Sequence, residues 1–404
     1  MSASSRRAVL AQAGSLLALA AAPALGAAPT APDFPFPGGN GARPLAHDFP
    51  QKGAMVLQRS RPPLLETPFT DFDGGVFTPN DKFFVRWHWL PPSEVDPASF
   101  RLKIHGQVER EIALSLSDLS KFDRVEIAAV NQCSGNSRGF FEPRVPGAQW
   151  GNGGMGNARW TGVRLSDVLD KAGIKADAVA ARFTGLDEAT VSDGPRFKKS
   201  LGIDRARQKD VIIATAMNGK PLPLLNGYPI RLVVPGWYST YWIKALNDIE
   251  LLDGPDDNYW MKTAYLIPET EQANMKPGQA GVTMVPINRM VPRSFITNLG
   301  AGARVKAHAP AKLRGLAMGG DCGVAKVEIS GDGGQTWRDA KLGKDEGPYS
   351  FRQWTAQVPA GAPGETVFAV RCTNTKGEMQ PDTPNWNPSG FMRNVVERLP
   401  VTVA

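Results

Sequence analysis

A polar turn that contains a single cysteine is the stretch of this sequence best suited to do chemistry. The apolar run 125–130 indicates a buried strand, and the turn after it contains Cys133 and, five residues later, Arg138. A fixed positive charge stabilises a thiolate, which is the nucleophilic and metal-binding form of cysteine. Free cysteine is also among the residue types most often buried in a core. On this stretch alone, Cys133 is a metal ligand, a nucleophile or a small buried thiol.

A second group of polar side chains lies in the aromatic segment 83–89. Its β-branched and aromatic residues favour a strand after the turn at 78–81. Arg86 and His88 are two residues apart, so they face the same side of that strand. A guanidinium and an imidazole on one face of an aromatic strand are unusual. The alternative is an edge strand whose polar face meets water.

Further cations stand beside apolar strands. Arg231 precedes the run 232–234, and Lys244 follows the turn at 235–238, with few acidic residues near either one. Cations placed in this way often bind an anion such as a phosphate, although each could also be a surface cation with a buried stem. No second Cys or His lies at zinc spacing, and no Cys-x-x-Cys-His motif is present. One soft thiolate among cations suits a metal held mostly by an organic cofactor, or a small anionic substrate.

Composition places the chain among ordinary globular proteins. Its 404 residues suggest two or three domains of roughly 150 residues each, and 42 Gly and 34 Pro favour many turns and short strands. The formal net charge of +7 is spread along the chain without a basic run that would indicate nucleic acid binding. Only three cysteines are present. Cys322 and Cys372 could pair in an oxidising compartment, although Cys322 lies in a turn.

The N-terminus predicts export. Arg6 and Arg7 precede a short apolar stretch, 11–22, and small residues up to Ala28, which is typical of a Tat signal over residues 1–28. The apolar stretch is too short and too rich in Ala for a stable membrane span, and no other stretch could cross a bilayer. Tat export carries folded proteins, often with a cofactor inserted. We therefore expect a periplasmic protein without a membrane span.

The rest of the chain predicts a strand-rich catalytic region followed by a sandwich. Residues 29–80 are expected to form an extended arm on the surface. A short helix is expected at 114–119 with Ser115 or Ser117 as its cap, a long Gly-rich loop at 141–162, and an amphipathic helix at 163–172. Strands are expected at 100–106, 125–130, 179–186, 211–217 and 232–234. From about residue 282, short strands at 312–318, 325–330, 337–340, 354–358 and 366–372 predict an immunoglobulin-like β-sandwich.

Several of these stretches together resemble a known family. They are FFVRWH at 83–88, NQCSGNSR at 131–138, GLD at 185–187, MNGKPLP at 217–223, GYPIR at 227–231, the segment 260–265, GDGGQTW at 331–337 and WNPSGF at 386–391. In this order they resemble the bacterial sulfite dehydrogenases that reduce cytochrome c, within the sulfite oxidase family of molybdenum enzymes. The resemblance implies an α+β fold, with a mixed molybdopterin-binding catalytic domain at 81–278 and a β-sandwich dimerisation domain at 279–404.

The resemblance also implies roles for particular residues. Cys133 would be the protein ligand of molybdenum in a molybdenum–molybdopterin cofactor. The positions that match the substrate pocket are Arg86, His88, Arg138 and Tyr265. The positions that match cofactor contacts are Phe84, Arg86, His88, Asp187, Asn226, Arg231, Trp242, Ile243 and Lys244. Two positions depart from the family: Asn226 stands where many members have His, and Cys322 stands near a substrate arginine of the vertebrate enzymes.

The implied function is oxidation of sulfite to sulfate, with electrons passed singly to a c-type cytochrome. The chain would act as a homodimer or as a heterodimer with a haem subunit. Three alternatives remain open from the residues. The chain could act on sulfane sulfur or a sulfoxide, it could be a nucleophilic enzyme with Cys133 and His88 as a dyad, or it could be a binding module built on the sandwich.

Replacing the thiol tests the role of Cys133. We expect Cys133→Ser to abolish sulfite oxidation and to keep the fold, because a hydroxyl is a hard, poor ligand for this metal. Activity is measured with sulfite, and folding by the thermal unfolding midpoint. Normal sulfite turnover by Cys133→Ser would contradict a ligand role.

Overall fold

The structure is a computed structural model that describes residues 31–39 and 41–404. The expected export signal at 1–28 lies outside the described residues. Ala31–Ala404 belong to one unit of tertiary contacts. Among the described residues, no helix has the length and apolar character that a bilayer crossing requires.

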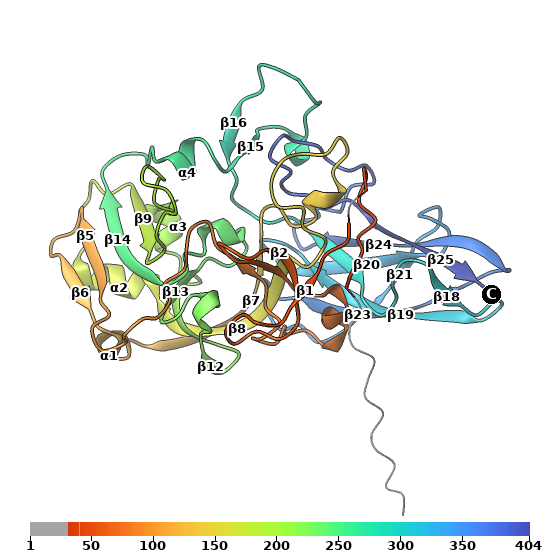
Figure 1. Cartoon of the computed structure of the whole chain (residues 1–404), viewed down its shortest axis with the longest axis horizontal. Coiled ribbons are helices and arrows are strands. Elements are labelled where there is room, and N and C mark those ends of the chain that lie inside the picture. The colour runs from red at the N-terminus through yellow and green to blue at the C-terminus, as the bar shows by residue number, and fades with distance from the viewer. Residues whose placement is uncertain (1–30, 40) are drawn as a thin grey trace, which may run out of the picture. The chain divides into compact units, whose positions relative to one another are not determined.

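The sheet that carries the cysteine turn is built from four strands in the order β12-β11-β8-β7, with β13 also pairing with β11 (Figure 1). Their bounds are β7 Arg124–Gln132, β8 Met155–Arg164, β11 Ile212–Met217, β12 Lys220–Pro221 and β13 Arg231–Val233. The first half of β7 alternates between inward and outward residues, and its last five residues are all buried. β7 therefore runs into the interior, and Cys133 lies there directly after the end of the strand.

A second sheet lies in the order β10-β9-β14-β5-β6, and only the β14–β5 pair is parallel. The strands are β5 Leu102–Gly106, β6 Ile112–Leu114, β9 Ala180–Gly185, β10 Lys198–Gly202 and β14 Leu246–Leu252. The α-helices among the described residues are short: α1 Leu116–Leu119, α2 Leu165–Ala172, α3 Ile203–Ala206 and α4 Tyr259–Lys262. Ser115 caps α1 in a capping box with Asp118, which confirms one of the two predicted caps.

The predicted surface arm is wrong for much of its length. Residues 45–66 form three strands that pair with the segment of Arg86, in the order β1-β2-β3-β4. The strands are β1 Leu45–Ala46, β2 Met55–Arg59, β3 Leu64–Glu66 and β4 Val85–Arg86. Met55 and Leu65 are fully buried and pack in one cluster with Val85 and Trp87. These short apolar stretches show no periodicity because each strand supplies only one or two residues to that cluster.

The predicted loop 141–162 is also wrong in its second half, because β8 begins at Met155. The glycines that suggested a loop are needed inside the strand. A Cβ at Gly156 would lie 2.6 Å from the Phe83 ring, and one at Gly162 would lie 2.0 Å from the Ile213 carbonyl oxygen. Close backbone packing is a second reason for glycine in a strand. The helix predicted at 163–172 accordingly begins two residues later than predicted, at Leu165.

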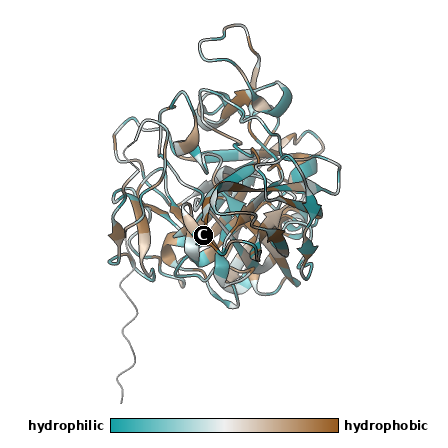
Figure 2. Ribbon diagram, turned by 90° about the vertical axis from the view of Figure 1, so that its right-hand side faces the viewer, coloured by the Kyte–Doolittle hydropathy of each residue, from teal (hydrophilic) through white to brown (hydrophobic). Residues whose placement is uncertain are grey.

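The C-terminal part is a sandwich of two sheets with its own core, drawn in cyan and blue in Figure 1. One sheet has the order β17-β19-β23-β22 and the other β18-β25-β24-β20-β21. The strands are β17 Arg293–Ile296, β18 Ala303–Val305, β19 Pro310–Met318, β20 Val324–Ser330, β21 Arg338–Asp339, β22 Lys341–Leu342, β23 Arg352–Pro359, β24 Gly364–Asn374 and β25 Glu397–Val403. All five predicted strands are present. Figure 2 shows hydrophilic and hydrophobic residues mixed along the ribbon. Exposed and buried residues alternate along the first half of β19. Cys322 and Cys372 are both free thiols.

Short elements join these sheets and complete the fold. They are β15 Leu266–Pro268, β16 Met284–Pro286 and the 3-10 helices η1 Phe69–Gly74, η2 Arg138–Phe140, η3 Leu224–Asn226, η4 Ser239–Tyr241 and η5 Glu271–Ala273.

The sandwich packs directly against the sheet that carries the cysteine. The Val130 amide donates to the Tyr349 carbonyl at 2.8 Å, and the Met392 amide donates to the Ser134 carbonyl at 3.2 Å. The side chain of Asn157 donates to the Ser350 hydroxyl at 2.8 Å. Both sides of the Cys133 turn are therefore held in part by the C-terminal residues.

A buried carboxylate holds the glycine-rich segment beside the same turn. Glu66 is 1% exposed and accepts hydrogen bonds from the amides of Gly151 and Gly153 at 3.1 and 2.8 Å. Gln58 donates to it as well, at 2.7 Å. Burial raises the pKa of Glu66 to about 7, although these N–H donors favour the charged form.

This raised pKa predicts a pH-dependent stability. The folded protein binds the Glu66 proton more tightly than the unfolded chain does. The stabilisation that protonated Glu66 gives to the folded state is therefore fully present below the unfolded pKa of about 4.5, and it is lost as the pH rises through about 7. We expect the unfolding free energy of the wild type relative to Glu66→Gln to fall by up to about 3 kcal/mol across that window. Denaturant unfolding at several pH values measures it. The exposed control Glu269→Gln should show no such trend, and a pH-independent effect of Glu66→Gln would contradict the prediction.

Candidate active site

A cavity at the end of β7 brings together most of the residues that the sequence singled out. Its walls come from the segment of β4, the turn after β7, the stretch before β10, the η3–β13 connection, η4 and the residues before β14 and β15. The lining residues are Phe84, Arg86, His88, Asn131, Cys133, Ser134, Phe197, Asn226, Arg231, Ser239, Thr240, Lys244 and Tyr265.

The predicted alternation along segment 83–89 is confirmed. Phe84, Arg86 and His88 all line the cavity, whereas Phe83, Val85 and Trp87 are at most 1% exposed in the core behind it. Only Val85 and Arg86 pair as a strand. The alternation nevertheless extends from Phe83 to His88, beyond the two paired residues.

His88 and Tyr265 form a hydrogen-bonded pair in this cavity. Their Nε2 and Oη atoms are 2.5 Å apart. The His88 ring stacks on Phe197 with centroids 3.6 Å apart. Burial, followed by the charge of Arg86, lowers the pKa of His88 well below its usual value, and burial raises the pKa of Tyr265. The pair therefore consists of a neutral imidazole and a neutral phenol.

The backbone of the Cys133 turn is fixed on several sides. The Cys133 amide donates to the Gly154 carbonyl at 2.9 Å, and the Asn136 amide donates to the Cys133 carbonyl at 3.0 Å. The Asn136 side chain in turn accepts from the Gly154 amide at 2.8 Å. Cys133 is 6% exposed, and no described residue hydrogen-bonds its Sγ atom. The thiol is thus held at the cavity wall by its main chain, with the sulfur available as a ligand.

Arg138 does not line the cavity. Its guanidinium donates to the carbonyls of Ser389, at 3.1 and 3.2 Å, and of Ala148, at 3.2 Å. It also lies 5.2 Å from the ring centre of Phe391. Burial lowers its pKa, and the neighbouring Cys133 raises it. The geometry thus favours a charge beside the thiolate, and the substrate role expected from the resemblance stays a prediction.

Arg231, Lys244 and Asp187 form a buried charged group at the cavity. Burial lowers the pKa of Arg231 to about 9 and that of Lys244 to about 7. The Lys244 ammonium lies 4.6 Å from the ring centre of Trp87, and no described residue lies within ion-pair distance of it. Asp187 does not line the cavity. Burial raises its pKa to about 6, against the charge of Lys244.

The side chains of Trp242 and Ile243 also lie outside the lining. The Trp242 ring packs edge-on against Trp160, and its Nε1 donates to the Trp237 carbonyl at 2.9 Å. Their main chains support the cavity instead, because the Trp242 carbonyl accepts from Arg231 at 3.3 Å and the Ile243 carbonyl from the Leu232 amide at 2.8 Å.

Sequence reasoning missed five lining residues and two buried lysines. The lining residues are Asn131, Ser134, Phe197, Ser239 and Thr240, and the lysines are Lys52 and Lys199. Asn131 and Ser134 belong to the motif at 131–138, so they could have been predicted as lining residues from the sequence. Lys199 stands where the alternation of Phe197 and Leu201 calls for an apolar residue, which was a usable signal. Nothing in the sequence around Lys52 marked it.

Lys52 orients the side chain of Asn226. Its ammonium donates to Asn226 Oδ1 at 2.5 Å and to the carbonyls of Asn80 and Phe83 at 2.7 and 2.8 Å. Asn226 Nδ2 donates to the Phe84 carbonyl at 3.1 Å. The amide oxygen is therefore committed to Lys52, and one N–H of Asn226 remains for a group in the cavity.

The polar atoms around the cavity fit an anionic, acceptor-rich cofactor. Five lining residues have a buried nitrogen or oxygen without a hydrogen-bond partner, namely Arg86 Nη1, Asn131 Nδ2, Ser134 Oγ, Arg231 Nε and Thr240 Oγ1. Buried polar atoms are nearly always paired in folded proteins. All five can donate, and Lys244 adds a cation. A phosphorylated pterin supplies the matching acceptors, and the Cys133 sulfur is a soft ligand suited to molybdenum.

Comparisons with known proteins agree with this geometry. Residues 88–260 match the oxidoreductase molybdopterin binding domain, and residues 285–404 match the Mo-co oxidoreductase dimerisation domain. The chain is 33% identical to mitochondrial sulfite oxidase of Macaca fascicularis over 89% of this chain and 68% of that protein. It is 30% identical to sulfite oxidase of Gallus gallus, over 92% and 81%. The sulfane dehydrogenase SoxCD from Paracoccus pantotrophus superposes with a TM-score of 0.69 at 25% identity, covering 83% of each chain.

The two matched domains make the chain a molybdopterin-dependent oxidoreductase with a molybdenum–molybdopterin cofactor. With these relatives, the chain belongs to the sulfite oxidase family. This membership confirms the predicted fold of a molybdopterin domain followed by a dimerisation domain. It also removes the alternatives of a nucleophilic enzyme with a Cys133–His88 dyad and of a non-catalytic binding module.

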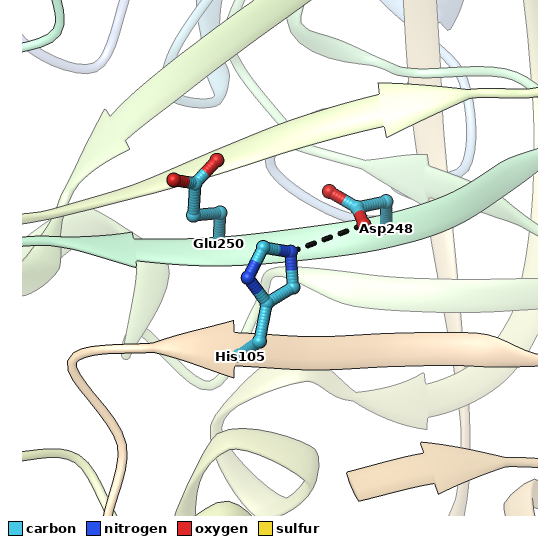
Figure 3. A group of neighbouring side chains, drawn as sticks. All are labelled: His105, Asp248 and Glu250. Atoms are coloured by element: carbon cyan, nitrogen blue, oxygen red, sulfur yellow. Dashed lines mark hydrogen bonds and ion pairs between the residues drawn. The ribbon is translucent and has the colours of Figure 1, made fainter. Parts of the chain in front are cut away.

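A separate group of possible metal ligands lies on the outer face of the second sheet (Figure 3). His105 on β5 and Asp248 and Glu250 on β14 have ligand atoms within 4.8 Å of one another. All three groups already have protein partners, since His105 bonds Asp248 at 3.1 Å and Glu250 pairs with Arg182. The arrangement is explained as a cross-strand ion-pair network on a polar sheet face.

The Lys52–Asn226 contact can be tested through cofactor content. We expect Lys52→Met to lower the molybdenum bound per chain about tenfold, because outer-shell partners typically affect metal retention on that scale. Elemental analysis of purified protein measures it, together with the thermal midpoint. The exposed Lys103→Met serves as the control and should retain its molybdenum. Full molybdenum content in a folded Lys52→Met protein would contradict the positioning role.

Proposed function

We propose that this molybdenum enzyme oxidises sulfite to sulfate. The observation that carries the proposal is the convergence of Arg86 and the His88–Tyr265 pair with Cys133 at one cavity. A guanidinium with an unpaired Nη1, a neutral imidazole and a neutral phenol suit a small oxyanion. The similarity to sulfite oxidases supports the same substrate.

The cofactor would be held by the cations and the thiol of this chain. Cys133 would ligate the metal, Lys244 and Arg231 would bind the anionic part of the pterin, and Asn226 would donate its free N–H. The bound molybdenum would supply two-electron oxidation of the substrate and one-electron release to an acceptor. The remaining work falls to binding, orientation and proton handling by side chains.

Arg86 would replace the hydration shell of sulfite with fixed donors. Sulfite carries up to two negative charges, and fixed charged donors in a site that excludes water bind such an anion more strongly than water-exposed groups do. Lys244 adds positive potential at the same cavity.

His88 and Tyr265 would handle protons. The overall conversion of sulfite and water into sulfate releases two protons and two electrons. A neutral imidazole can accept one proton at a ring nitrogen, and its pairing with Tyr265 Oη fixes which direction the ring faces. The lowered pKa of His88 would then return the proton to solvent readily.

The cellular setting is part of the same proposal. The twin arginine Arg6-Arg7 and the apolar stretch after it support Tat export to the periplasm. The chain contains no haem motif, so electrons would pass singly to a c-type cytochrome, met transiently or bound as a haem subunit. The match to a dimerisation domain supports pairing through the C-terminal sandwich.

A sulfane substrate is the second candidate. One solved structure that resembles this chain over 83% of its length is a sulfane dehydrogenase. The two candidate substrates differ in the group that must enter the cavity. Sulfite would enter it as a small free anion. Arg86 beside the His88–Tyr265 pair favours the small anion.

Steady-state kinetics on molybdenum-loaded protein test the proposal. We measure turnover of sulfite and of a sulfane-sulfur substrate, with ferricyanide and with cytochrome c as acceptors. Saturable sulfite oxidation with reduction of cytochrome c is expected. Turnover of the sulfane substrate without turnover of sulfite would assign the second candidate.

Replacement of Arg86 tests the sulfite contact itself. We expect Arg86→Lys to raise KM for sulfite about tenfold to a hundredfold, because the planar fork of donors is lost although the charge remains. This range corresponds to roughly 1.5–3 kcal/mol for a lost charged hydrogen bond. The exposed Arg101→Lys is the control. An unchanged KM in Arg86→Lys would place sulfite elsewhere.

A further inference from the structure

Lys199 is a buried cation that none of the roles above uses. It lies on β10 with 0% exposure, and its Nζ donates to the Trp260 carbonyl at 2.8 Å. Nζ also lies 4.6 Å from the ring centre of Tyr241 and 5.3 Å from that of Tyr265. Burying an ammonium is costly, and an apolar side chain would fill the position at lower cost. A requirement for charge at this place explains its presence.

Lys199 and its neighbour on the strand contact both members of the His88–Tyr265 pair. Phe197 lies two residues earlier, so it faces the same side as Lys199, and its ring stacks on His88. Lys199 lies at the face of the Tyr265 ring, whose Oη is bonded to His88. The start of β10 therefore supports the imidazole with an aromatic ring and the phenol with a cation.

After burial, four positive side chains contribute most to lowering the pKa of His88. Arg86 comes from its own segment, Arg59 from β2, Lys244 from the stretch before β14 and Lys199 from β10, while Tyr265 is neutral. Burial lowers the pKa of Lys199 to about 7, against the charge of Asp256. The pKa of His88 is lowered further below its own usual range. Lys199 is therefore charged at the pH where His88 would take up a proton.

We propose that Lys199 is a positioning residue for this pair, in which its ammonium fixes the Tyr265 ring and the main chain at Trp260, and its charge keeps His88 uncharged. The kinetic consequence rests on the proposed function, because a neutral His88 is the form that accepts a proton there. The effect on His88 itself does not depend on which substrate the enzyme uses.

Histidine side-chain NMR on ¹⁵N-labelled protein tests the effect directly. The chain has four histidines, and a His88→Asn variant assigns the signal. We expect Lys199→Met to raise the titration midpoint of His88 by about one pH unit, because a nearby positive charge is removed. Lys199→Arg keeps the charge and should keep the midpoint. Lys198→Met, on the opposite face of the strand, is the matched control and should leave the midpoint unchanged.

The pH profile of kcat/KM for sulfite is the second readout. In Lys199→Met the acid limb should move to higher pH, with about tenfold lower kcat/KM on that limb and little change above pH 8. An unmoved His88 midpoint in Lys199→Met overturns the proposal, and so does a Lys199→Arg protein that behaves like Lys199→Met. If Lys199→Met does not fold, Lys199→Gln takes its place. If the wild type does not oxidise sulfite, the proposed function fails, and the NMR titration still decides the role of Lys199.

Discussion

Buried positive charge with too few acids is the constraint on which this site depends. Lys52, Lys199 and Arg231 are at most 8% exposed, and Arg86 and Lys244 line the same cavity. Asp187 is the acid that acts on Lys244. Such a cluster is costly unless a bound anion completes it. The molybdopterin phosphate is a group of that kind, and the proposed oxyanion substrate would be another.

The cluster is tolerated in part because hydrogen-bond acceptors hold several of its cations. Lys52 is fixed by three oxygen acceptors, and Arg231 by the carbonyls of Asn226 and Trp242. The thiol is held in the same manner, by main-chain bonds to Gly154 and by the Glu66 carboxylate behind the glycine segment. The sandwich adds Met392 and Ser389 around the Cys133 turn. The sandwich therefore supports the Cys133 turn from outside, although its residues do not line the cavity.

Much of the site was predictable, and the errors have identifiable causes. Arg86 and His88 share a face because strand periodicity is local. Cys133 was found in the motif at 131–138, and Asn226 was found because it directly precedes the motif at 227–231. Glycine misled the reading of 155–164, since the same residue serves turns and tight strand packing. Residues 45–66 were wrongly predicted as a surface arm, because their strands are too short to show a period of two. Lys52 was missed, since a lysine buried by distant segments looks like any other lysine.

The sequence by itself determined the chemistry: a lone soft thiol, an Arg-x-His pair on an aromatic strand, and isolated cations beside apolar runs. These features depend only on residue type and short spacing, so they can be recognised from the sequence alone. Only the tertiary structure decided which groups face the cavity. It directed Arg138 toward the Ser389 and Ala148 carbonyls and placed Lys199 against Tyr265. The physical reason is that burial, pKa and hydrogen-bond partners depend on segments more than a hundred residues apart, such as Arg138 and Ser389, which no local pattern encodes.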